Sequence, residues 1–277
     1  MIDNKNLNKL QKTANTLRKL AVEMVYHAKS GHIGGSLSSA DILTALYFAE
    51  MKIDPNNPKW EERDRFVLSK GHITPAYYGV LALRGFFPVE ELKNFRKFTS
   101  FLQGHPDKNK VPGVDMSSGS LGQGLSTAVG IALAGKLKKA NYRSYALVGD
   151  GEMQEGQIWE ALMFAAARNL DNLCVIVDDN GVQADGRVED ICPLQPLDKK
   201  MQAFNLNTII VDGHDFKDIL SALENAKTTK GKPTVIIAKT VKGKGVSFME
   251  NKSLWHGKAP NDSEYDVAMD ELKGGAQ

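Results

Sequence analysis

One pattern constrains the fold of this sequence more than any other. Two apolar, β-rich segments, 145–148 and 173–177, each run into acidic or amide residues, and a segment with helical character, 155–169, joins them. This is the pattern of a βαβ unit, in which two parallel strands are connected by a right-handed crossover. Both strands therefore end at the same edge of a sheet, where Asp150 and Asn180 can meet.

The residues that follow these two strands predict a metal site. Asp150, Asn180 and the main-chain carbonyl of Val182 offer hard oxygen ligands, of the kind that Mg²⁺ or Ca²⁺ takes. Gly149 and Gly151 let the backbone approach a ligand closely, and the N-terminus of the next helix offers N–H groups to an anion. The sequence therefore predicts a diphosphate site bridged by a metal ion.

The remaining strand-like segments predict an α/β fold. They are separated by helical or loop segments, so a doubly wound, mostly parallel sheet with helices on both faces is the economical arrangement. We expect one domain, 1–277, which begins with a helix at 6–30 and closes with a helix and polar tail at 262–277. We also expect the loop 30–38 to lead into a helix, 39–50, with Ser39 as its N-cap. The further strand-like segments are 66–69, 208–214 and 233–238.

Bulk composition excludes several classes of protein. Apolar residues make up 42% of the 277 residues and charged residues 25%, with a net charge of +2 from 35 basic and 33 acidic side chains. The mixed signs do not predict nucleic-acid binding. No apolar run approaches the roughly 18 residues that span a bilayer, and no secretory signal is recognisable, so we expect a cytoplasmic protein. The two cysteines, Cys174 and Cys192, form no redox or zinc motif.

Four histidines lie in loops or at strand ends: His32, His72, His105 and His256. Taken one at a time, each can be an ordinary loop histidine. The glycine-rich run 119–124 resembles a phosphate cradle, but it matches neither a Walker A loop nor the Gly-x-Gly-x-x-Gly dinucleotide fingerprint. The lysine- and glycine-rich stretch 239–247 has a composition that suits either phosphate binding or a mobile, solvated loop.

These motifs together resemble those of the transketolase family. Gly-Asp-Gly followed about thirty residues later by Asp-Asn resembles the diphosphate-and-magnesium motif of thiamine diphosphate enzymes, and Gly-Asp-Gly-x-x-x-Glu-Gly-x-x-x-Glu-Ala is its transketolase form. Three further motifs are similar, in the family's order and at comparable spacing. The resemblance covers essentially the whole chain, but only the first of the three domains of a transketolase. The matching segments are 30–34, 64–72, 149–161 with 179–180, and 256–260.

The resemblance implies a role for each candidate residue. Histidines 32, 72, 105 and 256 would line the substrate channel and act in catalysis, and Mg²⁺ would be held by Asp150, Asn180 and Val182. Ser120 replaces a proline of the family's pattern, which leaves the loop less rigid. The implied cofactor-binding residues are His72, Gly119, Ser120, Leu121, Gly151, Glu152, Asn180 and His256.

The implied function is that of the N-terminal subunit of a split transketolase. Such an enzyme uses thiamine diphosphate and Mg²⁺ to transfer a two-carbon ketol unit from a ketose (phosphate) to an aldose (phosphate). A separate C-terminal subunit would supply the pyrimidine-binding domain and its glutamate, in an α2β2 assembly. The alternatives are a relative such as 1-deoxyxylulose-5-phosphate synthase, a non-catalytic regulatory subunit that keeps the diphosphate site, and a nicotinamide-dependent dehydrogenase, whose glycine fingerprint we do not find.

Overall fold

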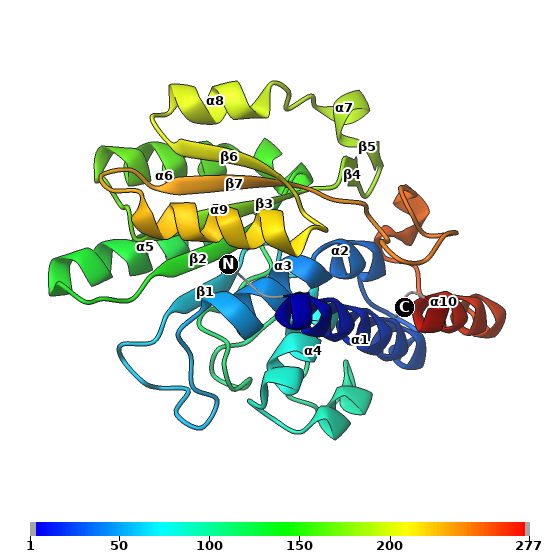
Figure 1. Ribbon diagram of the computed structural model, residues 1–277. Helices are drawn as coiled ribbons and strands as arrows, with labels where there is room; N and C mark the ends of the chain where they lie inside the picture. Colours follow the sequence, from blue (N-terminus) through cyan, green and yellow to red (C-terminus); the bar gives the residue numbers. More distant parts are fainter. Residues whose placement is uncertain (1–3, 275–277) are drawn as a thin grey trace.

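A five-stranded parallel sheet forms the centre of the computed structural model, which describes residues 4–274 (Figure 1). The strand order is β1-β2-β3-β7-β6, and each neighbouring pair is parallel. This confirms the predicted doubly wound α/β fold. A separate antiparallel hairpin, β4–β5, follows β3. The strands are β1 Arg65–Leu68, β2 Ser144–Gly149, β3 Leu173–Asp179, β4 Val182–Gln183, β5 Gly186–Arg187, β6 Asn207–Asp212 and β7 Thr234–Lys239.

Helices cover both faces of the sheet (Figure 1). Side chains alternate along a strand, so in β2 Tyr145 and Leu147 join one apolar core while Ala146 and Val148 join the other. The first core is completed by α1, α3, α4 and α9, and the second by α5, α6 and α8. Burial on both faces explains why these strands read as continuous apolar runs. The helices are α1 Asn4–Ala28, α2 Ile33–Ser38, α3 Ala40–Ala45, η1 Leu46–Glu50, α4 Thr74–Arg84, η2 Val89–Asn94, α5 Gln123–Lys138, η3 Gly151–Gln154, α6 Gly156–Ala167, α7 Val188–Ile191, α8 Leu197–Ala203, α9 Phe216–Thr228, η4 Ser253–His256 and α10 Asp262–Gly274.

Residues 240–257, which we call the C-terminal loop, pack against the start of the chain. Val246, Met249 and Trp255 form a third apolar core with residues of α1, α2 and α10. The N–H of Gly243 donates to the carbonyl of Gly34 in α2 at 3.0 Å. A Cβ on Gly34 would lie only 2.8 Å from the Trp255 carbonyl oxygen, so this glycine permits the close approach.

The segment after α1 differs from the sequence-based prediction. Part of the expected loop at 30–38 is helix α2, and the expected helix at 39–50 divides into α3 and the π-helical turn η1. Ser39 occupies the N-cap position of α3, as predicted, but its side chain makes no cap hydrogen bond. Its hydroxyl instead donates to the buried carboxylate of Asp178 at 3.2 Å and accepts from Lys70, because charged partners form stronger hydrogen bonds than a free backbone N–H.

No helix within residues 4–274 combines the length and the apolar character that crossing a membrane requires.

Candidate functional site

The ends of β2 and β3 bring the first predicted ligands together. Gly149 of β2 pairs with Asp178 of β3, so the residues that follow the two strands emerge side by side. Asp150 Oδ2 accepts a hydrogen bond from the N–H of Gly181 at 2.5 Å, and Gly181 directly follows Asn180. The side chains of Asp150 and Asn180 therefore belong to one turn, although thirty positions separate them in the sequence.

The three predicted metal ligands are all oriented within this turn, which we call the metal turn (Asp150 and residues 180–182). Asn180 Oδ1 accepts from the N–H of Val182 at 3.1 Å, which fixes the amide. The Val182 carbonyl accepts from Lys242 Nζ at 2.7 Å. A carboxylate, an amide oxygen and a carbonyl thus lie on two adjacent chain segments, and the Lys242 ammonium already bonds to the carbonyl.

Burial perturbs both charged groups at the metal turn. Asp150 is 3% exposed, and burial together with the nearby charge of Asp178 raises the pKa of its carboxyl. Lys242 is also 3% exposed, and burial lowers the pKa of its ammonium, while the Asp150 charge opposes that change. Sequence reasoning did not assign Lys242 to the site. Its only signal was a Lys/Gly-rich stretch, a composition shared with mobile loops.

A second buried carboxylate, that of Asp178, lies at this edge of the sheet. Sequence reasoning did not assign Asp178 to the site. Its fully buried carboxylate accepts from Ser38 Oγ at 2.6 Å and from Asn180 Nδ2 at 3.0 Å, and it forms an ion pair with Lys70 and a hydrogen bond with Thr240. Burial by itself would raise the pKa of Asp178, but Lys70 outweighs burial and brings the pKa to about 2. Asp178 therefore orients Asn180 while Lys70 neutralises its charge.

Glu152, a predicted cofactor-binding residue, is engaged by the protein itself. Its buried carboxylate accepts from Ser69 Oγ at 2.5 Å and from the N–H groups of Gly122 at 2.9 Å and Gly149 at 3.0 Å. These partners lie directly after β1, directly before α5 and at the end of β2. The side chain thus holds these segments together, and a direct cofactor contact of Glu152 would have to come from its backbone.

Three of the four predicted histidines form one cluster. The ring centroids of His32 and His72 are 4.8 Å apart, and His256 lies 5.3 Å from His32 and 5.4 Å from His72. Burial lowers the pKa of His32 to about 4, of His256 to about 3 and of His72 well below its ordinary value. All three rings are therefore neutral at physiological pH. The buried Nδ1 of His32 has no hydrogen-bond partner within residues 4–274, which leaves it available to a ligand.

The tautomer of His256 follows from its neighbour. Lys242 Nζ lies 2.9 Å from His256 Nδ1. A charged ammonium has only donors to offer, so Nδ1 is the acceptor and the ring proton of His256 resides on Nε2. The Nε2–H is then a hydrogen-bond donor.

His105 lies apart from the three-ring cluster. Its side chain is exposed and its ring packs on Gly119: a Cβ on Gly119 would be 3.0 Å from His105 Cδ2. Gly119 adopts φ = +154° and the side chains of Ser120 and Leu121 are exposed. The loop 119–121 therefore forms the outer rim of the site, next to the turn that carries His72, since Gly71 closely approaches Gly119.

The arrangement fits a metal-bound diphosphate ester. The metal turn offers hard oxygen donors, and the buried ammonium groups of Lys70 and Lys242 lie at the same strand ends. The cluster of neutral histidines adjoins Lys242 through His256, and the buried Nδ1 of His32 has no hydrogen-bond partner within residues 4–274. This combination defines the class of α/β domains that hold the diphosphate of an enzyme cofactor at the carboxyl edge of a parallel sheet.

The chain belongs to the transketolase family. Residues 9–274 match the family described as "Transketolase, thiamine diphosphate binding domain". It is 48% identical over 264 residues to the 6-deoxy-6-sulfo-D-fructose transketolase subunit SqwG of Clostridium sp. (strain MSTE9), which covers 95% of this chain and 96% of that protein. It is 43% identical over 255 residues to one named subunit of the apulose-4-phosphate transketolase of Phocaeicola vulgatus, covering 92% of this chain and 90% of that protein.

Longer transketolases contain this chain as one part. Human transketolase is 44% identical over 261 residues, which cover 92% of this chain but 41% of the human protein. The crystal structure of the Campylobacter jejuni transketolase superimposes with a TM-score of 0.90 at 37% identity, covering 95% of this chain and 42% of that one. The chain thus spans about two fifths of these transketolases and corresponds to their thiamine diphosphate-binding domain.

Proposed function

We propose that this chain is the N-terminal subunit of a two-chain transketolase that uses thiamine diphosphate and Mg²⁺. The observation that carries the proposal is the metal turn, where the Asp150 carboxylate bonds to the backbone beside Asn180. In this assignment Asp150, Asn180 and the Val182 carbonyl hold Mg²⁺ on the cofactor diphosphate. Ca²⁺ is the alternative ion for the same oxygen ligands.

The lysines complement the metal in this proposal. Lys242 donates to the Val182 carbonyl, which is one of the assigned metal ligands. An ammonium and a metal ion compete for that carbonyl, so we expect Lys242 to turn toward a phosphate oxygen when the metal binds. Lys70 stays with Asp178, because separating this buried pair would leave two uncompensated charges.

The chain's own contribution to the chemistry comes from its neutral histidines. Bound thiamine diphosphate supplies the carbanion and the electron sink for moving a two-carbon unit. His256, with its proton on Nε2, is set to donate a hydrogen bond to an oxygen that gains negative charge. His32 and His72 lie within the same cluster and suit the hydroxyl groups of a sugar, since a neutral imidazole both donates and accepts. We assign His105 to the outer part of the substrate channel.

The remaining cofactor contacts form the rim of the site. We assign Gly119, Ser120 and Leu121 to backbone contacts with the cofactor ring, and Gly151 and Glu152 to backbone contacts with its diphosphate. The exposure of residues 120 and 121 supports this assignment, because it leaves the rim open to a second protein surface.

The substrates we propose are a ketose donor and an aldose acceptor, each with an anionic group such as phosphate. Support comes from the named relatives, one for apulose 4-phosphate and one for 6-deoxy-6-sulfo-D-fructose. Both names describe a ketose that carries an anion at the far end.

A separate C-terminal subunit with the pyrimidine-binding domain completes the proposed enzyme as an α2β2 assembly. The relatives that match nearly end to end are named as subunits, which supports a partner chain. We further propose that residues 1–277 form one domain, in which α1 (Asn4–Ala28) and α10 (Asp262–Gly274) are the first and last described elements. A cytoplasmic location agrees with the free thiols of Cys174 and Cys192.

Reconstitution tests this function. The full chain is mixed with a candidate partner, thiamine diphosphate and Mg²⁺, and two-carbon transfer between a ketose phosphate and an aldose phosphate is followed. We expect activity only when both chains, the cofactor and the metal are present. Normal turnover by the purified chain alone would contradict the two-subunit assignment, and cofactor binding without turnover in the complex would instead favour a regulatory subunit.

A further inference from the structure

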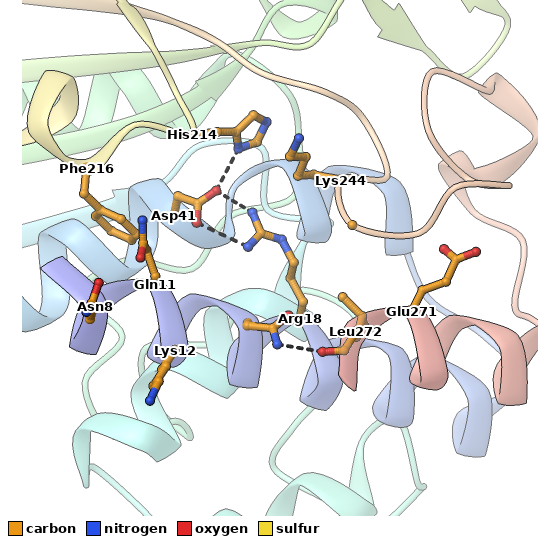
Figure 2. Close-up of a pocket in the computed structure, with 12 residues that line it drawn as sticks. Asn8, Gln11, Lys12, Arg18, Asp41, His214, Phe216, Lys244, Glu271 and Leu272 are labelled. Atoms are coloured by element: carbon orange, nitrogen blue, oxygen red, sulfur yellow. Dashed lines mark hydrogen bonds and ion pairs between the residues drawn. The ribbon is translucent and has the colours of Figure 1, made fainter. Parts of the chain in front are cut away.

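A polar cavity of about 540 Å³ lies between α1, α3, the β6–α9 turn and the C-terminal loop (Figure 2). Three of its side chains, Arg18, Asp41 and His214, come from separate elements and point toward one another (Figure 2). They are largely buried, with side-chain exposures of 9%, 7% and 13%. None of them touches the metal turn or the histidine cluster through any hydrogen bond of the described chain, so the proposed function leaves them without a role.

The three residues form a directed chain of contacts. Arg18 makes an ion pair with Asp41, and Arg18 Nη1 donates to Asp41 Oδ1 at 3.2 Å. Burial alone would raise the pKa of Asp41, but Arg18 and the hydrogen bond to His214 outweigh it and lower the pKa. The ionised carboxylate accepts from His214 Nδ1 at 2.7 Å.

The far side of the His214 ring reaches the C-terminal loop. His214 Nε2 accepts a hydrogen bond from the backbone N–H of Val241 at 2.9 Å. An N–H group can only donate, so Nε2 carries no proton, and the contact with Asp41 holds the proton on Nδ1. The ring is thereby fixed in one tautomer, with its acceptor aimed at the residue that precedes Lys242.

We propose that His214 is a positioning residue. By accepting from the Val241 N–H it fixes the backbone of the C-terminal loop, and so it places the Lys242 ammonium at the metal turn. Val241 and Lys242 are adjacent, and Lys242 reaches the Val182 carbonyl at 2.7 Å and His256 Nδ1 at 2.9 Å. The inference deepens the proposed function and rests on it for the role of Lys242. The anchoring of the loop itself depends only on the contacts of His214.

The contact of His214 lies between two other attachments of the C-terminal loop. Before it, the Thr240 N–H donates to the Asp179 carbonyl at 3.1 Å and the Thr240 hydroxyl bonds to Asp178. Gly243 donates to the Gly34 carbonyl at 3.0 Å, and Asn251 donates to the Lys242 carbonyl at 2.9 Å. Without His214, the Val241 N–H would lose its acceptor, and leaving such a group unpaired is costly. The backbone between Thr240 and Gly243, which includes Lys242, would then shift until that N–H reached water.

Two substitutions at one position separate the two contacts of the ring. In His214→Gln the side-chain oxygen can take the place of Nε2 and accept from Val241. In His214→Asn the amide takes the place of Nδ1 and donates to Asp41, but nothing reaches Val241. A positioning role therefore predicts that the glutamine variant behaves like the wild type and the asparagine variant does not.

The first readouts need no cofactor. Hydrogen exchange of the Val241 amide in the full chain should be about tenfold faster in His214→Asn and within about threefold of the wild type in His214→Gln. Acylation of Lys242 by an amine reagent should accelerate in His214→Asn only. His27, exposed on α1, gives the matched control, because His27→Asn should change neither rate.

Binding of thiamine diphosphate with Mg²⁺ to the complex with the partner chain then links the anchor to the site. His214→Asn should weaken cofactor binding about tenfold, whereas His214→Gln should bind the cofactor like the wild type. Equal exchange at Val241 in the wild type and His214→Asn, or faster exchange in His214→Gln, would overturn the inference even if the asparagine variant folds poorly. Failure of the wild-type complex to bind the cofactor would count against the proposed function and leave the anchor intact.

Discussion

Asp150 and Asp178 lie at the ends of neighbouring strands and are both almost completely buried, yet they have different partners. Asp178 has a lysine, Lys70, in direct ion-pair contact. Asp150 is held by the backbone N–H groups of Gly151 at 2.7 Å and Gly181 at 2.5 Å. The chain therefore supplies the counter-charge for one carboxylate as part of its own structure, and in the proposed function a bound metal ion supplies it for the other.

The largest effect should come from removing the internally paired carboxylate. Asp178→Ala leaves Lys70 buried without its counter-charge, which costs about 3–5 kcal/mol in the free energy of unfolding. Urea denaturation of the chain measures this loss. The double variant that also replaces Lys70 with Met should recover much of it, because the uncompensated charge is gone. If Asp178→Ala were as stable as the wild type, the ion pair with Lys70 would not distinguish Asp178 from Asp150.

Asp150→Ala should have the opposite profile. The chain without ligand should lose less stability than Asp178→Ala does, about 1–3 kcal/mol, because two backbone N–H groups lose their acceptor but no ion pair is broken. Binding of thiamine diphosphate in the presence of Mg²⁺ should weaken by about 100-fold or more, as measured by calorimetry on the complex with the partner chain. Asp179→Ala, which removes a carboxylate at the end of the neighbouring strand β3, is the control. Unchanged metal-dependent binding in Asp150→Ala would remove the metal assignment.

The histidine cluster differs from both carboxylates, because its buried rings are neutral and need no counter-charge. Burial, together with Arg96, His105 and Lys242, lowers the pKa of His32 to about 4. Between the ordinary pKa of about 6.5 and the lowered value, the unfolded chain binds a proton that the folded chain does not, so stability falls as the pH falls through this range.

His32→Asn removes that dependence. Between about pH 7.5 and pH 5, the wild type should lose about 2 kcal/mol more of its free energy of unfolding than the variant does. Denaturation curves at the two pH values measure the difference. Parallel losses in the two proteins would mean that the ring is charged in the folded state, like an ordinary surface histidine.

The smallest effect should come from an ion pair at the same edge that is partly exposed. Lys239 pairs with Asp179, and the lysine side chain is 51% exposed. Lys239→Ala should change the free energy of unfolding by less than about 1 kcal/mol. If Lys239→Ala lowered the free energy of unfolding as much as Asp178→Ala does, burial would not explain why the Lys70–Asp178 ion pair stabilises the chain more than the Lys239–Asp179 pair.

The sequence predicted those parts of the site that depend on strand direction. Asp150 and Asn180 follow two segments whose composition identifies them as parallel strands, and the meeting of their ends is a property of the βαβ unit. The parallel sheet and its two helical layers followed from the same alternation of segments. His32, His72 and His256 were found through motifs, and the structure brings the three rings within 5.4 Å of one another.

What the sequence did not predict depends on contacts between distant elements. Lys70 follows β1 by two positions and meets Asp178, 108 residues away. Lys242 lies in a stretch whose composition suits a solvated loop, yet it is buried because the glycine at position 34 lets the loop approach α2. Ser39 lies at the N-cap position predicted from the sequence, but its hydroxyl bonds to a buried carboxylate from β3 and not to the backbone of the helix. Such competition is decided by the tertiary structure, which local patterns do not describe.

The docking of the C-terminal loop on α2 also sets the order in which the site can be completed during synthesis. A growing chain emerges and folds from its N-terminus. His32 and His72 are therefore available before Asp150 and Asn180, whereas Lys242 and His256 emerge after all of them. A ribosome-bound chain has no finished pocket for the cofactor until residues 240–257 have folded back onto α2, so ligand binding reports that these distant parts of the chain have met.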